Sequence, residues 1–264
     1  MEDKKEIITD LVETGADISG SIAGSVIGGL VAGPAGIILG GASGPLITKA
    51  FKKIGSEIQK RFISKREEIR IGAAYAFAIH KLENNIKNGR VIRTDAYFDS
   101  KENKRSDAEE IFEGVVLSAQ REYEERKVRF IGNLYGNICT NDKINREHAN
   151  QLVKTSNNLS FRQFCILQLL RDKKSEQNLF PKLRSIDETR IELGDIIIEI
   201  RDLQQKGLIS ITARWNDTDD NSSPIAYDDI GITANGIMFC EMLSLDEIEK
   251  EELEKLNKSA RIKL

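Results

Sequence analysis

The chain has 264 residues, enough to bury one large hydrophobic core or two smaller ones. Its 39 basic and 42 acidic residues leave a formal net charge of −3, which excludes a protein that binds nucleic acid through an overall basic field. The three cysteines, Cys139, Cys165 and Cys240, are far apart in apolar sequence, so we expect buried thiols. Residues 1–17 predict a short amphipathic helix unlike a signal peptide, so we expect a cytoplasmic protein.

Residues 18–48 contain no charged side chain, although 31% of the whole chain is charged. Pro34 and Pro45 interrupt this segment, which predicts two short helical arms that meet at a Gly33-Pro34 turn. Small residues at four-residue spacing let helix backbones approach closely, so we predict a glycine zipper that brings copies of the chain together. The glycines assigned to this contact are Gly20, Gly24, Gly28, Gly29, Gly33, Gly36, Gly40 and Gly44.

The length of the uncharged arms bears on their environment. An arm from Ile18 to Gly33 would be about 24 Å long as a helix, shorter than the roughly 30 Å hydrocarbon core of a bilayer. We therefore expect a hairpin that inserts shallowly into a membrane, or one that is sheltered until a trigger releases it. In water the same glycine ridges would form a buried hairpin within a helical bundle, and a flexible linker is the third interpretation.

Apolar residues recur every three or four positions after Pro45, which predicts one long helix to about Asn88. This helix and a polar connector make up residues 49–105. Its first half is basic, which is typical either of contact with anionic lipid headgroups or of a solvated face of a bundle. The cations assigned to headgroups are Lys49, Lys52, Lys53, Lys60 and Arg61.

A central helical region is expected over residues 106–158. Ser106 with Glu109 three positions later has the pattern of a capping box, and the helix that it starts is predicted to run to Cys139. A further helix is predicted from Asn145 through Leu152.

Residues 159–245 show the order helix, helix, β-hairpin and helix, which is typical of a winged helix, and residues 246–264 predict a charged helical tail. The second helix would enter DNA in such a module. It carries more acidic than basic residues, so we expect a protein partner and no DNA. Its acidic residues are Asp187, Glu188, Glu192, Asp195, Glu199 and Asp202, and its basic residues are Arg190, Arg201 and Lys206.

The sequence contains no recognisable catalytic motif. His80 lies in an apolar stretch and His148 in a polar one, and neither has a nucleophile or metal ligand at a meaningful spacing. No phosphate-binding loop, zinc-protease motif or nucleophile elbow occurs. We therefore assign no catalytic, cofactor-binding or metal residue, and we expect a protein that is not an enzyme and has no cofactor.

The stretch RKVRFIGNLYGNICTNDKINREHANQLVKTSNNLSFRQFCILQLLRD and the glycine-rich N-terminal block together resemble the bacterial abortive infection alpha (Abi-alpha) proteins. Residues 157–160, Asn-Asn-Leu-Ser, resemble the short polar break in those proteins after which the last helix of the stretch begins. The resemblance covers Ile111 to Leu170, carries over no catalytic residue and leaves Trp215 to Asp229 unmatched. It implies antiviral defence against phage, through harm to the membrane of the infected cell.

The sequence thus predicts a mainly α-helical chain with a glycine-zipper hairpin, a long helix, a central helical domain and a C-terminal winged helix with a small β-hairpin. The function expected is a non-enzymatic, homo-oligomeric effector that engages the cell membrane from its inner face or forms pores in it. A soluble winged-helix interaction or regulatory protein, whose glycine hairpin is buried core, is the alternative. A structural component of a phage or prophage is a third interpretation.

Overall fold

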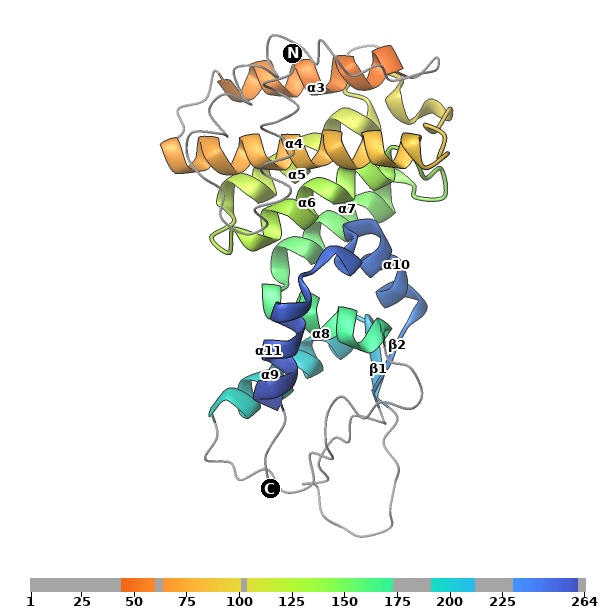
Figure 1. Cartoon of the computed structure of the whole chain (residues 1–264). Coiled ribbons are helices and arrows are strands. Elements are labelled where there is room, and N and C mark those ends of the chain that lie inside the picture. The colour runs from red at the N-terminus through yellow and green to blue at the C-terminus, as the bar shows by residue number, and fades with distance from the viewer. Residues whose placement is uncertain (1–43, 60–63, 101–103, 173–190, 212–229, 261–264) are drawn as a thin grey trace. The chain divides into compact units, whose positions relative to one another are not determined.

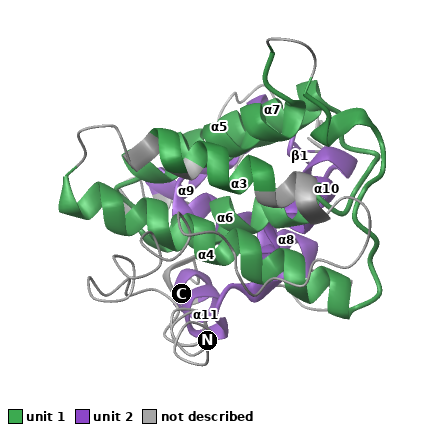
Figure 2. Ribbon diagram, turned by 90° about the horizontal axis from the view of Figure 1, so that it is seen from above, with its two compact units in different colours: residues 1–158 green, residues 159–264 purple. Residues whose placement is uncertain are grey.

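The computed structural model describes residues 44–59, 64–100, 104–172, 191–211 and 230–260 (Figure 1). These residues are mainly helical, with one small antiparallel sheet of two strands, so the predicted mainly α class is confirmed. The chain divides into two compact units, Met1–Asn158 (unit 1) and Leu159–Leu264 (unit 2), which Figure 2 shows in different colours.

Unit 1 is a stack of helices in which α4 is the central member. Its elements are α3 (Gly44–Gln59), α4 (Lys65–Lys87), the short 3-10 helix η1 (Ala96–Phe98), α5 (Asp107–Arg121), α6 (Arg126–Ile138) and α7 (Arg146–Asn158). Helix α4 packs on α5 and α6, and α5 also contacts α3 and α7 (Figure 1). The interior of α4, from Ile71 to Ile79, is buried, as its small apolar sequence predicts.

Helices α4 and α6 approach so closely that two positions of α6 must be glycine. A Cβ atom at Gly132 would lie 2.6 Å from the carbonyl oxygen of Ala74, and one at Gly136 would lie 2.7 Å from that of Ala78. Both helices carry small residues four positions apart on the facing sides, so the backbones themselves are in contact. Backbone contact of this kind gains dispersion energy along the whole crossing.

An aromatic cluster joins four helices beside this crossing. Phe51 of α3, Tyr75 of α4, Phe112 of α5 and Tyr135 of α6 have ring centroids 4.4 to 5.8 Å apart. Tyr75 donates a hydrogen bond from its hydroxyl to the carbonyl of Phe51 (3.2 Å). Because Phe51 lies at the centre of the cluster, α3 is part of the core of unit 1.

The predicted single helix from Pro45 to Asn88 is wrong, because a second helix begins after Ser64. Ser64 has extended backbone angles (φ −71°, ψ 159°) and forms a capping box with Glu67. Glu67 also accepts a hydrogen bond from Gln120 (2.9 Å), and the hydrogen bonds from Ser64 and Gln120 lower the pKa of its carboxyl to about 2. The pattern Ser-Lys-Arg-Glu at residues 64–67 is a local signal that would have placed this start.

The predicted helix from Ser106 to Cys139 is also two helices. Its start is confirmed, since Ser106 and Glu109 form the expected capping box. It ends at Arg121 because Glu122 adopts an extended conformation (ψ 121°) and its carboxylate turns inward. There it pairs with Lys127 at 2.6 Å, with both side chains only 3% exposed. A buried ion pair across the corner therefore separates α5 from α6, whereas helix α7 after Asn145 is confirmed.

Unit 2 contains the predicted helices and hairpin in the predicted order. Its elements are α8 (Phe161–Arg171), α9 (Ile191–Gln205), β1 (Ile209–Ile211), β2 (Ile230–Ile232), α10 (Ala234–Leu243), the 3-10 helix η3 (Leu245–Glu247) and α11 (Lys250–Ala260). The strands pair Ile209 with Ile232 and Ile211 with Ile230. Helix α9 ends before Gly207, which has φ +70°, and Phe164 meets Phe239 in the core (ring centroids 5.9 Å apart).

We expect Gly132→Ala and Gly136→Ala each to lower the free energy of unfolding by about 1–3 kcal/mol, because the added methyl group forces the two backbones apart. Gly114→Ala in α5 is the matched control, since its Cβ would meet only Val153 at an ordinary 3.6 Å. That control should gain up to about 1 kcal/mol from helix propensity. Denaturant unfolding followed by circular dichroism measures all three, and equal effects at the three positions would contradict the close crossing.

Candidate functional site

The glycines predicted to form a zipper lie almost wholly outside the described residues. Gly44 is the first residue of α3. The zipper therefore stays a prediction, and the described part of the site begins with α3. The glycines outside the described ranges are Gly20, Gly24, Gly28, Gly29, Gly33, Gly36 and Gly40.

Helix α3 presents two of the predicted headgroup ligands to solvent. Lys49 and Lys52 are exposed, whereas Ala50, Phe51 and Ile54 of the same helix are buried against unit 1. One side of α3 is thus fixed in the core while another side exposes ammonium groups to solvent. Lys60 and Arg61 lie outside the described residues.

Lys53 has a different environment from Lys49 and Lys52. Its ammonium group lies 2.6 Å from the carboxylate of Glu109, whose side chain is only 2% exposed. The same carboxylate oxygen accepts the backbone N–H of Ser106 at 3.3 Å, as part of the capping box of α5. Lys53 therefore neutralises a buried charge and ties α3 to α5.

A second ionic link joins α3 to the start of α5. The guanidinium of Arg105 contacts Glu57 of α3 at 2.6 Å and also pairs with Glu113 of α5. Together with Lys53 and Glu109, this link holds α3, the helix in which the uncharged segment ends, firmly on the rest of unit 1.

In unit 2, the acidic side chains of α9 bind the start of α8. Glu199 accepts hydrogen bonds from Ser160 (2.8 Å) and Arg162 (2.7 Å), and Asp202 accepts one from Gln163 (2.8 Å). Asp195, Ile198 and Arg201 of α9 are exposed, and Ile198 has 66% of its surface accessible. This outward face of α9 therefore carries an apolar residue between two residues of opposite charge.

A buried polar cluster at the end of α4 is the feature that sequence reasoning missed. Arg93 is buried and forms two hydrogen bonds to Asp95 (2.7 and 2.5 Å) and one to the carbonyl of Ile144 (2.8 Å). Its guanidinium lies 4.0 Å above the ring of Tyr97. The hydrogen bond from Arg93 lowers the pKa of Asp95. The one signal in the sequence is the Arg-Thr-Asp spacing, which does not reveal that the arginine is buried.

This cluster joins separate segments of unit 1 through hydrogen bonds. Asn85 donates to the side chains of Asn137 and Thr140, each at 3.0 Å, which joins the ends of α4 and α6. Burial raises the pKa of the nearby Cys139 thiol to about 12, so the thiol stays protonated at neutral pH.

The prediction of buried thiols is confirmed, because Cys139, Cys165 and Cys240 are all free and buried. His80 lies beside Asn84 on α4, with the Asn84 amide nitrogen 3.3 Å from its ring, and His148 lies half-buried on α7. Within the described ranges, no group of three or more His, Cys, Asp or Glu side chains could hold a metal ion.

No helix in the described part of the chain is both long enough and apolar enough to cross a bilayer. Comparison of the chain with models of protein families, with curated proteins and with solved structures found no match. The features that bear on function are the exposed face of α3, the uncharged segment that ends within it and the outward face of α9.

We expect Lys53→Gln to lower the free energy of unfolding by about 1–2 kcal/mol, because it leaves Glu109 charged and buried without its cation. Lys52→Gln, at an exposed neighbouring position, should change stability little. The double variant Lys53→Gln with Glu109→Gln should recover stability, since it removes the lone buried charge and keeps a capping glutamine. Urea unfolding of the four proteins checks this, and a loss of equal size in Lys52→Gln would contradict it.

Proposed function

We propose that the protein is a non-enzymatic effector that binds the inner face of the cell membrane through its uncharged glycine-rich segment. The observation that carries this proposal is the junction at Thr48. An uncharged segment ends there and is followed at once by the exposed Lys49 and Lys52, on a helix whose other side is fixed in a folded core. An apolar segment with cations at its boundary is suited to a layer of acyl chains beneath anionic headgroups.

The energetic argument concerns the boundary lysines. Each lysine near an anionic surface contributes roughly 1 kcal/mol of attraction. Lys49 and Lys52 together would therefore strengthen binding about thirtyfold, which decides whether a shallow hairpin stays bound. Lys53 is left out of this role because it pairs with Glu109. Lys60 and Arg61 remain part of the proposal on sequence grounds.

The predicted glycine zipper, Gly20 to Gly44, gives the effector a means to form homo-oligomers. Helices in lipid associate through backbone contact, which glycines at four-residue spacing permit. The crossing of α4 and α6, with Gly132 and Gly136 against Ala74 and Ala78, is an example of such contact within the same chain.

Unit 2 is, in this proposal, a winged-helix-like module that binds a protein and controls the membrane-binding part. The order of α8, α9, the β1–β2 hairpin and α10 supports the winged-helix assignment. The exposed Ile198 between Asp195 and Arg201 supports a protein partner. With the resemblance to Abi-alpha proteins, these features support a role in antiviral defence by abortive infection.

A soluble interaction or regulatory protein is the second candidate, favoured by one observation. The glycines of α6 bury their ridge against α4 inside unit 1 and not in lipid. The uncharged segment could pack by the same chemistry as a hairpin in water. The two candidates differ in a single measurable property, which is binding of the full-length protein to vesicles.

We expect the full-length protein to float with vesicles that contain phosphatidylglycerol, and to float less with vesicles of phosphatidylcholine alone. The double variant Lys49→Gln with Lys52→Gln should bind the anionic vesicles about thirtyfold more weakly, because two headgroup contacts are lost. Its thermal stability should stay unchanged, since both side chains are exposed. Flotation at graded lipid concentrations gives both affinities.

The matched control removes two cations from the other end of unit 1, Lys65→Gln with Arg121→Gln, and should bind as the wild type does. Equal losses of vesicle affinity in both double variants would mean that only the net charge of the protein matters, and not the position of Lys49 and Lys52. Absence of flotation of the wild type with either vesicle would favour the soluble candidate.

The zipper is tested separately. Gly24→Leu with Gly28→Leu should raise helix propensity yet abolish oligomers in vesicles or detergent, because the leucine side chains hold the backbones apart. Cross-linking followed by electrophoresis measures the oligomer, and an unchanged size would contradict a zipper. Gly15→Leu, at a glycine outside the predicted zipper, is the matched control variant.

A further inference from the structure

The turn that follows α4 presents an apolar side chain to solvent. Val91 has 76% of its surface exposed, and the preceding residues 87–90 are exposed as well. The backbone of this turn is well defined: Asn88 donates to the carbonyl of Asn84 and Arg90 to that of Asn85, both at 2.9 Å. Gly89 has φ +82°, a conformation that L side chains rarely adopt.

The residues after Val91 keep it pointing outward. Ile92 is buried, and Arg93 is held by Asp95, by the carbonyl of Ile144 and, through its backbone N–H, by the carbonyl of Cys139 (3.0 Å). Val91 therefore lies between a glycine turn and two anchored residues. Its exposure is imposed by its neighbours, so it cannot fold back onto the core.

Exposed cations surround this apolar tip. Lys87 and Arg90 belong to the turn itself, and Lys143 belongs to the loop after α6, which Arg93 joins to the turn. Among the described residues, these three cations have no ion-pair partner. Asp142 is exposed next to Lys143, and Asp95 is neutralised by Arg93, so the tip stays positive.

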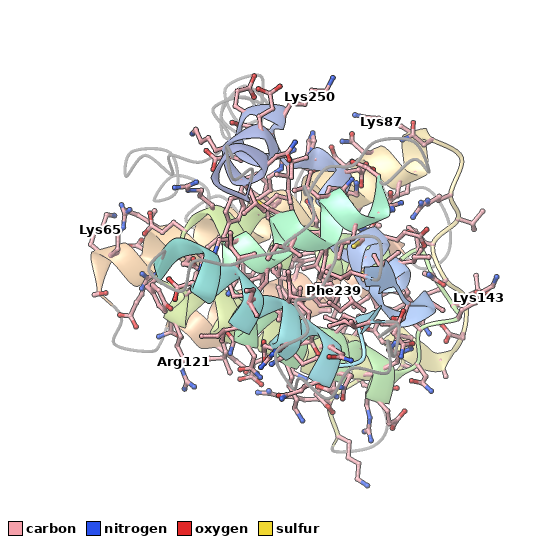
Figure 3. All side chains as sticks on the ribbon, turned by 90° about the horizontal axis from the view of Figure 1, so that it is seen from below. Lys65, Lys87, Arg121, Lys143, Phe239 and Lys250 are labelled. Carbon is pink, nitrogen blue, oxygen red and sulfur yellow. The ribbon has the colours of Figure 1, made fainter. Side chains whose placement is uncertain are left out.

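The tip lies at the end of unit 1 where the uncharged segment joins it. Figure 1 shows the first turns of α3 at the same end as η1 and the last turn of α4, and α3 contacts η1. Figure 3 shows Lys87 and Lys143 on one side, with Lys65 and Arg121 on the opposite side. One flat surface could therefore meet both the start of α3 and the turn.

We infer that Lys87–Val91, with Lys143, is a second membrane-contact element, in which Val91 enters the headgroup layer of an anionic bilayer and the three cations bind lipid phosphates. This inference rests on the proposed membrane function and assigns it an orientation: the end of unit 1 that carries the turn faces the bilayer. A valine tip adds little apolar area, and the cations beside it supply most of the attraction.

The test places an environment-sensitive fluorophore at the tip. The three native thiols are buried, so an NBD label reacts selectively with the new thiol in Val91→Cys. Tyr123→Cys is the matched control, since Tyr123 is 85% exposed and is two residues along the chain from Arg121, which lies at the opposite end of unit 1. With phosphatidylglycerol vesicles, NBD emission should rise and shift to shorter wavelength at position 91 and stay unchanged at position 123.

A second arm measures the cations by flotation. Lys87→Gln with Arg90→Gln should weaken binding to the anionic vesicles about thirtyfold, whereas Lys65→Gln with Arg121→Gln should leave it unchanged. Wild-type flotation with an unchanged probe at position 91 would overturn this inference and leave the proposed function standing. Equal emission changes at positions 91 and 123 would also overturn it, because the contact would not be oriented. A wild type that floats with no vesicle would overturn both.

Discussion

The contact between the backbones of α4 and α6 is the constraint on which unit 1 depends. Gly132 and Gly136 let the two helices approach until the carbonyls of Ala74 and Ala78 fill the space of a side chain. That distance places Tyr75 and Tyr135 near enough to enclose Phe112 and Phe51, so α5 and α3 pack onto a site that the crossing creates. At the other end of the crossing, Asn85 donates a hydrogen bond to the side chain of Asn137 of α6.

Polar side chains set the corners of this bundle. The Ser64–Glu67 capping box starts α4, the buried Glu122–Lys127 pair turns the chain between α5 and α6, and Arg93 fixes the turn after α4. The buried Lys127 and Arg93 each have a specific partner, because an unpaired charge in the interior would cost several kcal/mol. The corners are therefore specific, and they orient the surface turn that carries Val91.

The proposed function and its alternative rest on the same physical property. Small residues at four-residue spacing bring helices together in water and in lipid alike. The glycines from Gly20 to Gly44 therefore do not by themselves distinguish a hairpin in the membrane from a hairpin in water. The proposed membrane role rests on the residues that adjoin these glycines. Lys49 and Lys52 are exposed, whereas Lys53 pairs with Glu109, so similar neighbouring lysines lie in different environments.

Local patterns in the sequence determined much of this protein: the mainly helical class, the capping box at Ser106, the β-hairpin of unit 2 and the buried thiols. These features depend on spacing between near neighbours. Only the tertiary structure decided that Glu122 breaks a helix, that Lys53 belongs to Glu109, and that Arg93 is buried. Their partners lie on other elements or depend on burial, and the spacing of residues along one helix carries no information about which side chain a neighbouring helix will present.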